Sequence, residues 1–245
     1  MSGDGGKELS RRGALRVLGG AGVVALIGCG GDGVGTSTST GTGTGSASGA
    51  SCVLTPEETV GPYFVDEKLN RSDLTTNTTD ANVVDGIPLA LTLTIMNYSG
   101  SGCSKLAGAL VDIWQADAGG VYSDEASEHT SGQTYLRGYQ ITDSSGVVKF
   151  KTIIPGWYSG RTVHIHVMIR TTTTTGATAF EFTTQLFFDQ TIIDAIFTTV
   201  SPYSSRGVPD TTNGADNIYE SATQLTLQTA SGGGYTAAMT LGVQT

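Results

Sequence analysis

Positive charge is scarce in this chain. The 245 residues include 13 Lys and Arg against 22 Asp and Glu, which gives a net charge of −9. From residue 52 to the end there are nine basic and nineteen acidic residues, a net charge of −10. A domain that binds nucleic acid needs a basic patch to neutralise phosphates. The composition therefore argues against nucleic acid as a partner.

The chain also lacks an apolar run of membrane-spanning length near its start. The apolar residues 17–27 are fewer than the ~20 that cross a bilayer as a helix. They follow Ser10–Arg16, which is similar to a twin-arginine export signal, although Ala14 stands where an aromatic residue is usual. They end at Leu26-Ile27-Gly28-Cys29, which resembles a lipobox, so Cys29 is expected to carry a lipid after cleavage. An ordinary cleaved signal with a chance cysteine is the alternative.

Core-forming side chains are almost absent from residues 30–51, which are nearly all Gly, Ser, Thr and Ala. Such a segment cannot bury enough apolar surface to offset its chain entropy. We therefore divide the chain into an export signal, residues 1–29, a flexible tether, residues 30–51, and one compact domain, residues 52–245. This organisation predicts an exported lipoprotein at a periplasmic or other extracytoplasmic membrane surface. The membrane is contacted only through the lipid.

Cysteine is rare within the domain, where only Cys52 and Cys103 occur. In an exported protein, two such cysteines are expected to form a disulfide, here between the start of the domain and a later loop. Two separate free thiols are the alternative.

Helical periodicity is equally rare in the domain, and no internal repeat is present. Residues 87–97 alternate apolar and polar side chains with period two, as a half-buried strand does. Similar runs occupy residues 109–115, 136–142, 147–153, 163–170, 179–188, 223–229 and 235–243. Asp143-Ser-Ser-Gly146 has the composition of a hairpin turn, and only residues 189–197 have a short helical pattern. The sequence predicts an all-β antiparallel sandwich or barrel with long loops and at most one or two short helices.

Histidine is scarce too, yet two of the three histidines form a His-x-His pair. In a strand, His164 and His166 would point to the same face, with stems roughly 6–7 Å apart, so that both rings could reach one metal ion. The alternative is a pair of hydrogen-bonded polar residues on a buried strand face. His129 lies in the polar run 127–132 and is expected to be solvated.

The surroundings of this pair contain no nearby Asp or Glu, so the two-His-one-carboxylate set of ferrous oxygenases is not indicated. The neighbours are instead Tyr158 and Arg161. A hard trivalent ion lowers the phenol pKa from ~10 and binds the phenolate, which favours ferric iron over Zn(II) or Cu(II). Tyr122, beyond a Gly-Gly bend, offers a second phenol in a loop. Tyr122 could also be a packing residue.

Six short motifs follow one another through most of residues 52–210. They are Thr55–Tyr63, Val111–Tyr122, Tyr135–Gly138, Pro155–Tyr158, Arg161–His166 and Thr184–Phe188. In this order they resemble the intradiol ring-cleavage dioxygenases, the group of protocatechuate and catechol dioxygenases that use non-haem ferric iron. The resemblance implies the β-sandwich of that group.

The same resemblance implies a ligand set and a reaction. The Fe(III) ligands would be Tyr122, Tyr158, His164 and His166, with a hydroxide completing the site. A catechol-type substrate would displace Tyr158 and the hydroxide, which take up its protons. Reaction with O₂ would then open the ring to a cis,cis-muconate-type diacid.

Three further residues receive roles from the resemblance. Arg161 would stabilise negative charge on the bound ring, Gln185 would lie beside that arginine, and Tyr63 would line the pocket. From the residues alone, Arg161 could also be a surface ion-pair partner, and Gln185 and Tyr63 ordinary strand and turn residues.

Other functions remain open from the sequence. A lipid-anchored sandwich that binds iron or catecholates without turnover is the main alternative. A structural adhesin would suit the Thr- and Gly-rich composition but leaves the Tyr, Arg and His cluster unexplained. The chain has no counterpart of the helical N-terminal region with which cytosolic catechol dioxygenases dimerise, so its oligomeric state stays open.

Overall fold

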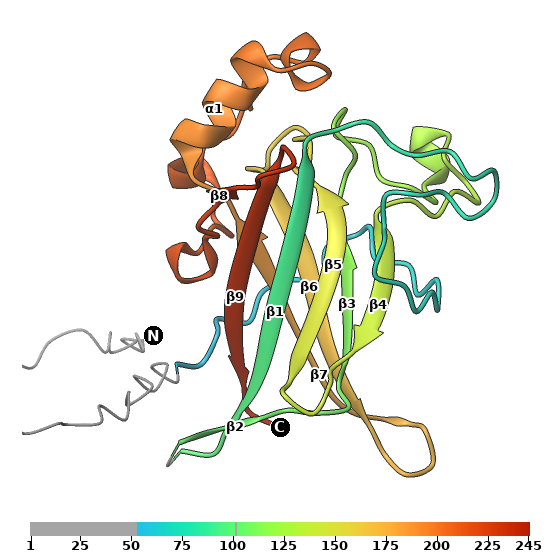
Figure 1. Cartoon of the computed structure of the whole chain (residues 1–245), viewed down its shortest axis with the longest axis vertical. Helices are drawn as coiled ribbons and strands as arrows, with labels where there is room; N and C mark the ends of the chain where they lie inside the picture. Colours follow the sequence, from blue (N-terminus) through green and yellow to red (C-terminus); the bar gives the residue numbers. More distant parts are fainter. Residues whose placement is uncertain (1–52, 101) are drawn as a thin grey trace, which may run out of the picture. The chain divides into compact units, whose positions relative to one another are not determined.

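Two β-sheets form the domain in the computed structural model, which describes residues 53–100 and 102–245. The first sheet contains β1 (Pro88–Tyr98), β2 (Cys103–Lys105), β5 (Val147–Ile153), β8 (Gln228–Thr229) and β9 (Tyr235–Val243). The second contains β3 (Leu110–Trp114), β4 (Arg137–Ile141), β6 (His164–Thr172) and β7 (Thr178–Phe187). The sheets lie face to face as two layers (Figure 1). The predicted all-β class is confirmed.

The order of strands in the first sheet is β2-β1-β9-β8, with β5 on the edge of β1 that β2 also uses. The second sheet has the order β4-β3-β6-β7. All strand pairs are antiparallel except β1 and β9, which run parallel from Leu89 to Asn97. The sequence did not predict this pair, because period-two alternation says nothing about the direction of a partner.

The turn at Asp143–Gly146 joins β4 to β5, which belong to different sheets. The carboxylate of Asp143 accepts hydrogen bonds from the backbone amides of Ser145 and Val147, at 2.7 and 3.0 Å. The expected tight turn is therefore present, but it crosses between the layers and forms no hairpin within one sheet. Turn chemistry fixes the reversal of the chain, not the partner of each strand.

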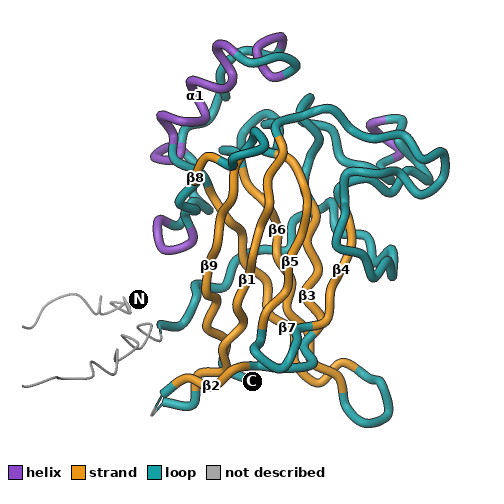
Figure 2. The backbone as a smooth tube through the Cα atoms, in the orientation of Figure 1, coloured by secondary structure: helices purple, strands orange, loops and turns teal. Residues whose placement is uncertain are grey.

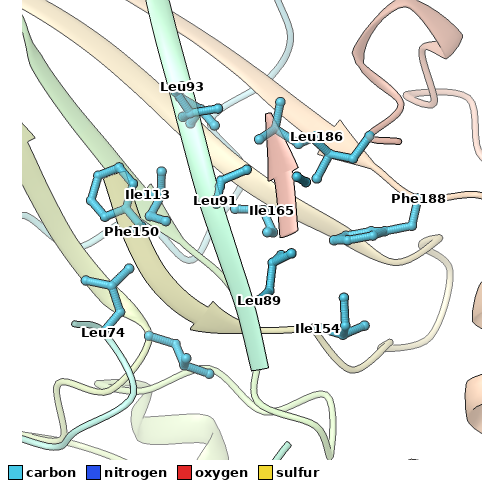
Figure 3. Close-up of a cluster of buried hydrophobic side chains, with 14 of the residues drawn as sticks. Leu74, Leu89, Leu91, Leu93, Ile113, Phe150, Ile154, Ile165, Leu186 and Phe188 are labelled. Atoms are coloured by element: carbon cyan, nitrogen blue, oxygen red, sulfur yellow. The ribbon is translucent and has the colours of Figure 1, made fainter. Parts of the chain in front are cut away.

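The core fills the space between the two sheets (Figure 3). On β1, every second residue is at most 1% exposed: Leu89, Leu91, Leu93 and Ile95. On β6 the corresponding buried residues are Ile165, Val167 and Ile169. Each such aliphatic side chain contributes roughly 1.5–3 kcal/mol on burial. Because neighbours in a strand alternate in direction, His164 and His166 point to the opposite, outer face of the second sheet.

One α-helix, α1 (Gln190–Thr199), occurs among the described residues, as the pattern at 189–197 predicted. Asp189 caps it by accepting hydrogen bonds from the amides of Thr191 and Ile192, at 2.9 and 3.2 Å. Short 3-10 turns cover residues 126–128, 203–205, 213–215 and 221–223. The strand expected at 223–229 is limited to β8, at residues 228–229. Long loops gather at one end of the sheets (Figure 2).

Several features predicted near the start of the chain cannot be compared with the structure. The export signal, Cys29, the tether and Cys52 lie outside the described residues. Cys103 begins β2, a strand of three residues that is too short for periodicity to predict. Within residues 53–100 and 102–245, no helix is long and apolar enough to cross a membrane.

Candidate active site

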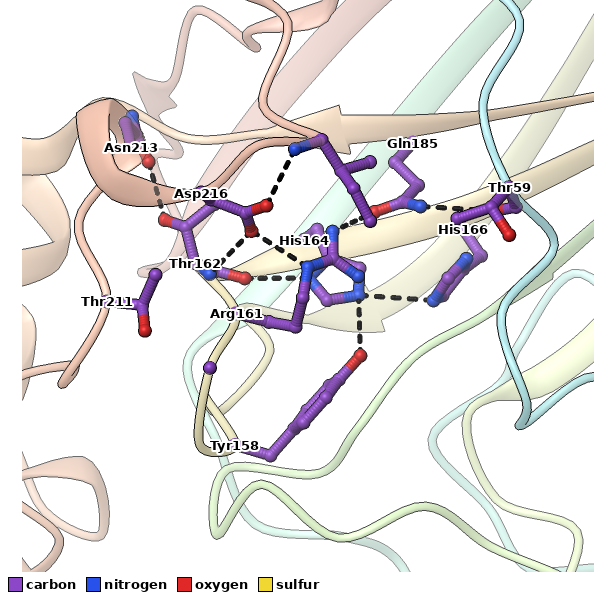
Figure 4. Close-up of polar contacts among 12 residues, drawn as sticks. Thr59, Tyr158, Arg161, Thr162, His164, His166, Gln185, Thr211, Asn213 and Asp216 are labelled. Carbon is purple, nitrogen blue, oxygen red and sulfur yellow. Dashed lines mark hydrogen bonds and ion pairs between the residues drawn. The ribbon is translucent and has the colours of Figure 1, made fainter. Parts of the chain in front are cut away.

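The two histidines of β6 converge at their Nε2 atoms, which are 3.1 Å apart (Figure 4). His164 donates its Nδ1 hydrogen to the carbonyl oxygen of Thr162 at 2.6 Å, which leaves Nε2 with its lone pair. The ring of His166 stacks on the indole of Trp114, with centroids 4.7 Å apart and planes at 6°. This stack follows from the register, since Trp114 of β3 pairs directly with His166.

Tyr158 and Tyr122 reach the same place from two loops. The Tyr158 hydroxyl lies 3.3 Å from Nε2 of His164, and the two tyrosine rings meet edge to face with centroids 5.7 Å apart. Tyr122 is 2% exposed, and its hydroxyl makes no hydrogen bond with any part of the described chain. A buried polar atom without a partner is costly, so this hydroxyl marks a place for a ligand.

A tight backbone contact brings these two loops together. The amide of Gly156 donates to the carbonyl oxygen of Asp117 at 2.8 Å. A Cβ at position 156 would overlap that carbonyl and the amide nitrogen of Gly120, so only glycine fits. The segment before Tyr158 can therefore pack on the bend that carries Tyr122.

Buried hydrogen bonds hold the backbone of the Tyr122 loop in place. Thr130 donates its hydroxyl to the carbonyl oxygen of Tyr122 at 2.6 Å. The guanidinium of Arg137, itself 1% exposed, donates to the carbonyl oxygens of Ser123 and Tyr63, both at 2.6 Å. One buried arginine thus joins the Tyr122 loop to the Tyr63 turn.

Tyr63 lies where the sequence placed it, against the candidate ligands. Its ring stacks on Tyr122, with centroids 4.4 Å apart and planes at 17°, and it meets Tyr158 edge to face at 5.5 Å. In the same turn, Gly61 has a φ of +73°, and a Cβ there would lie 3.2 Å from Cε1 of His166. The Gly-Pro-Tyr turn is therefore one wall of the site.

Burial sets the protonation of these side chains. It lowers the pKa of His164 to about 3, and, with the neighbouring His164, it lowers the pKa of His166 well below the usual value. Both imidazoles are neutral near pH 7 and can act as metal ligands. Burial raises the pKa of Tyr122 well above 10, and the adjacent Tyr158 adds to the effect. A phenolate here needs a cation at close range.

The donor set fits a hard trivalent ion. No group of three or more His, Cys, Asp and Glu in the described part of the chain is arranged to hold a metal. A metal at this place would therefore bind two imidazole nitrogens and two phenol oxygens, from His164, His166, Tyr122 and Tyr158. Phenolate oxygen with imidazole suits ferric iron better than the softer divalent ions.

Arg161 lies beside this cluster with its guanidinium held at two points. Nε donates to Oδ2 of Asp216 at 2.8 Å, and Nη2 donates to Oε1 of Gln185 at 2.5 Å (Figure 4). Gln185 is fully buried and donates to the carbonyl oxygen of Thr59 at 3.2 Å. Arg161 is thus an ion-pair partner, but in a largely buried pair next to the candidate ligands rather than on the surface.

The sequence missed two contributors to this site. Asp216 lies 55 residues after Arg161 in a loop without periodicity, and no local pattern marks it. Trp114 lies in a motif that was noticed, but its stacking on His166 required the β3–β6 register. His129, by contrast, is exposed as expected.

The model of the family described as Dioxygenase matches residues 59–222, which hold every candidate site residue above. Comparison with curated proteins found no match.

Several solved structures are similar. An intradiol ring-cleavage dioxygenase from Tetranychus urticae is 29% identical, with a TM-score of 0.66, over 79% of this chain and 95% of that one. The dioxygenase domain of a dioxygenase–carbohydrate-binding protein fusion from Streptomyces sp. SirexAA-E is 29% identical, with a TM-score of 0.56, over 78% and 99%. A 3-chlorocatechol 1,2-dioxygenase from Rhodococcus opacus 1CP shares the fold at 20% identity, with a TM-score of 0.53, over 77% and 72%. The chain belongs to the intradiol ring-cleavage dioxygenases.

Proposed function

We propose that the chain is a non-haem Fe(III)-dependent enzyme that cleaves a catechol-type ring with O₂ to a cis,cis-muconate-type diacid. One observation carries the proposal: Nε2 of His164 lies 3.1 Å from Nε2 of His166 and 3.3 Å from the hydroxyl of Tyr158, beside the unpartnered hydroxyl of Tyr122. Two neutral imidazoles and two phenols in one buried cluster suit ferric iron and little else. When bound, ferric iron would supply a Lewis acid that holds both catechol oxygens and draws electron density from the ring.

The two tyrosines differ in burial, and we assign them different roles. Tyr122 is buried and fixed by its stack on Tyr63, so it stays in place as a ligand. Tyr158 is only partly buried, and Ser159 and Gly160 directly after it are exposed, so its side chain can move away. With a catechol in its place, Oη of Tyr158 would accept one of the two catechol protons.

Arg161 supplies the fixed positive charge. Its guanidinium lies next to the Tyr158 hydroxyl, where it works against the rise that burial causes in the pKa of that phenol. A substrate that takes the place of Tyr158 therefore meets this cation. A preorganised charge aimed at developing negative charge is usually a large catalytic contribution.

Aromatic side chains form the walls of the substrate site. Trp114, Tyr63 and Phe64 pack around the ligands in one cluster with Met168. A flat aromatic substrate can slot between such rings, and the apolar walls keep water from the reacting carbon.

The test is a panel of catechols given to protein loaded with ferric iron, with oxygen uptake and diacid formation measured together. We expect uptake and diacid in equal amounts, and neither from iron-free protein. Tight catechol binding without oxygen uptake would refute the proposed ring-cleaving activity and favour a catecholate-binding module instead.

We also propose that the chain is exported, that a lipid on Cys29 anchors it, and that a disulfide links Cys52 to Cys103. The motif order at residues 10–29 and the scarcity of cysteine support this proposal. Labelled fatty acid should be incorporated by the wild type and not by Cys29→Ser. A peptide containing Cys52 linked to Cys103 should appear by mass spectrometry without reductant, and breaking the link should cost about 2–4 kcal/mol.

A further inference from the structure

We propose that Asp216 is a positioning residue for ring cleavage, because its carboxylate holds the Arg161 guanidinium in the direction of the substrate. The inference rests on the proposed function, since Arg161 has a catalytic role only there. The hydrogen-bond partners of the Asp216 carboxylate are Arg161, Thr162 and Ile218, none of which is a candidate ligand. Its effect on the reaction must therefore pass through Arg161.

The Asp216 carboxylate is itself held on both oxygens. Oδ2 accepts hydrogen bonds from Nε of Arg161 at 2.8 Å and from the amide of Thr162 at 2.9 Å. Oδ1 accepts from the amide of Ile218 at 2.9 Å. The side chain is 2% exposed, so water does not compete for these bonds. A buried, charge-assisted bond to a planar guanidinium fixes both its position and its plane.

The guanidinium is also held at its other end. Nη2 donates to Oε1 of Gln185, and Gln185 is in turn tied to the backbone of Thr59. The bonds to Asp216 and Gln185 leave Nη1 unused. With Nε on Asp216 and Nη2 on Gln185, rotation of the fork is blocked at two points. Loss of Asp216 would leave only the contact with Gln185.

Residues 210–216, called the 210–216 segment, form hydrogen bonds with the loop that carries Tyr158 and Arg161. Asp210 accepts from the hydroxyl of Ser159 at 2.7 Å and from the amide of Gly160 at 3.1 Å. Asn213 accepts from the hydroxyl of Thr162 at 2.5 Å. Among these three side chains, Asp216 is the one that binds the guanidinium itself. The 210–216 segment thus holds the backbone of the loop, and Asp216 holds the position of the Arg161 guanidinium.

The charges around Arg161 agree with this assignment. Burial raises the pKa of Asp216, but hydrogen bonds from Ile218, Thr162 and Arg161 outweigh it and leave the pKa below its usual value. Burial and the neighbouring Glu220 raise the pKa of Glu58, the other carboxyl near Arg161, to about 8. Near pH 7, Asp216 is therefore ionised and Glu58 is mostly neutral. Arg161 has one charged carboxylate as its direct partner.

The experiment compares iron-loaded wild type, Asp216→Ala, Asp216→Asn, Arg161→Ala and the double variant Arg161→Ala/Asp216→Ala. We expect Asp216→Ala to lower kcat/KM on the order of 10–100-fold, as loss of a supporting partner commonly does. Asp216→Asn should lose less, because a neutral hydrogen bond remains. Iron content and the visible tyrosinate band should not change. The double variant should be no slower than Arg161→Ala alone, because both changes act through one group.

Asp143→Ala is the matched control, because Asp143 also holds two backbone amides but lies in the β4–β5 turn. It should keep wild-type kcat/KM. A crystal structure of iron-free Asp216→Ala should show the guanidinium moved away from its place beside Gln185. An unmoved guanidinium, wild-type kcat/KM in Asp216→Ala, or additive losses in the double variant would each overturn the inference. An iron-loaded wild type that cleaves no catechol would overturn the proposed function, and the inference with it.

Discussion

His164 and His166 present their Nε2 atoms to each other across 3.1 Å. Because the carbonyl oxygen of Thr162 takes the Nδ1 hydrogen of His164, the Nε2 atom of that ring is an acceptor. Two imidazole lone pairs cannot face each other at this distance without a hydrogen or a cation near both. The pair is therefore arranged to share one electrophile. The phenol oxygens of the two tyrosines favour ferric iron in that role.

Removal of one imidazole should remove the metal. His164→Ala is expected to bind less than a tenth of the iron that the wild type binds, to lose the visible tyrosinate-to-iron band and to lose turnover. Iron content and the visible spectrum of the same sample are the measurements. His129→Asn, which changes an exposed histidine, should keep both properties. Full iron content in His164→Ala would mean that the ligands are misassigned.

Removal of the guanidinium should separate colour from activity. Arg161→Ala is expected to keep the iron and its visible band but to lose about 10²–10³-fold in kcat, the usual effect of removing one preorganised donor. Arg161→Lys should recover little, because an ammonium cannot bridge Asp216 and Gln185 as a planar fork does. Steady-state kinetics on iron-matched samples measures the effect. A kcat within threefold of wild type in Arg161→Ala would exclude a catalytic role.

A methyl group on the wall of the site should weaken iron binding. Gly61→Ala places a Cβ 3.2 Å from Cε1 of His166 at a φ of +73°, so it both strains the backbone and presses on a candidate ligand. Gly176→Ala has a similar φ of +83° with no atom within 4 Å of the added Cβ. Both variants should lose about 1–2 kcal/mol of stability. Only Gly61→Ala should also bind iron more weakly, as measured by competition with a chelator. Equal iron affinity in the two variants would mean that His166 is not held by this turn.

The sequence predicted those parts of the site that lie close together along the chain. The His-x-His pair and Tyr158 fall within nine residues, and strand alternation alone places both imidazoles on one face. Asp216 could not be predicted in this way, because its contact with Arg161 depends on how a loop folds back. The parallel β1–β9 pair and the crossing of the Asp143 turn between layers were missed for a related reason. Local patterns fix conformation, whereas partners over long distances depend on tertiary packing.

Burial of Glu58 should make the stability of the iron-free protein depend on pH. The pKa of this carboxyl is raised to about 8 in the folded chain by burial and by Glu220, against about 4.5 when it is unperturbed. The folded state therefore binds more protons between these values, and stability falls as pH rises through that window. Glu58→Gln should match the wild type near pH 4 and be more stable at pH 8, by roughly 1–2 kcal/mol once solvent screening of the half-buried group is allowed for.

Urea unfolding at pH 5 and pH 8 measures this difference. Glu57→Gln is the control, because Glu57 is exposed and adjacent to Glu58 in the sequence. It should follow the pH dependence of the wild type. A Glu58→Gln variant with that same dependence would show that the carboxyl is not held protonated in the fold.

The most direct test of the account uses iron-loaded protein, catechol and ¹⁸O₂, with the product identified by mass spectrometry. Catechol and one O₂ together have the composition of a muconic acid, so no further reductant or oxidant is required. We predict a cis,cis-muconate-type diacid that carries two ¹⁸O atoms, formed by the wild type and absent with His164→Ala. No diacid from protein that holds one ferric ion per chain, or a product without label, would contradict it.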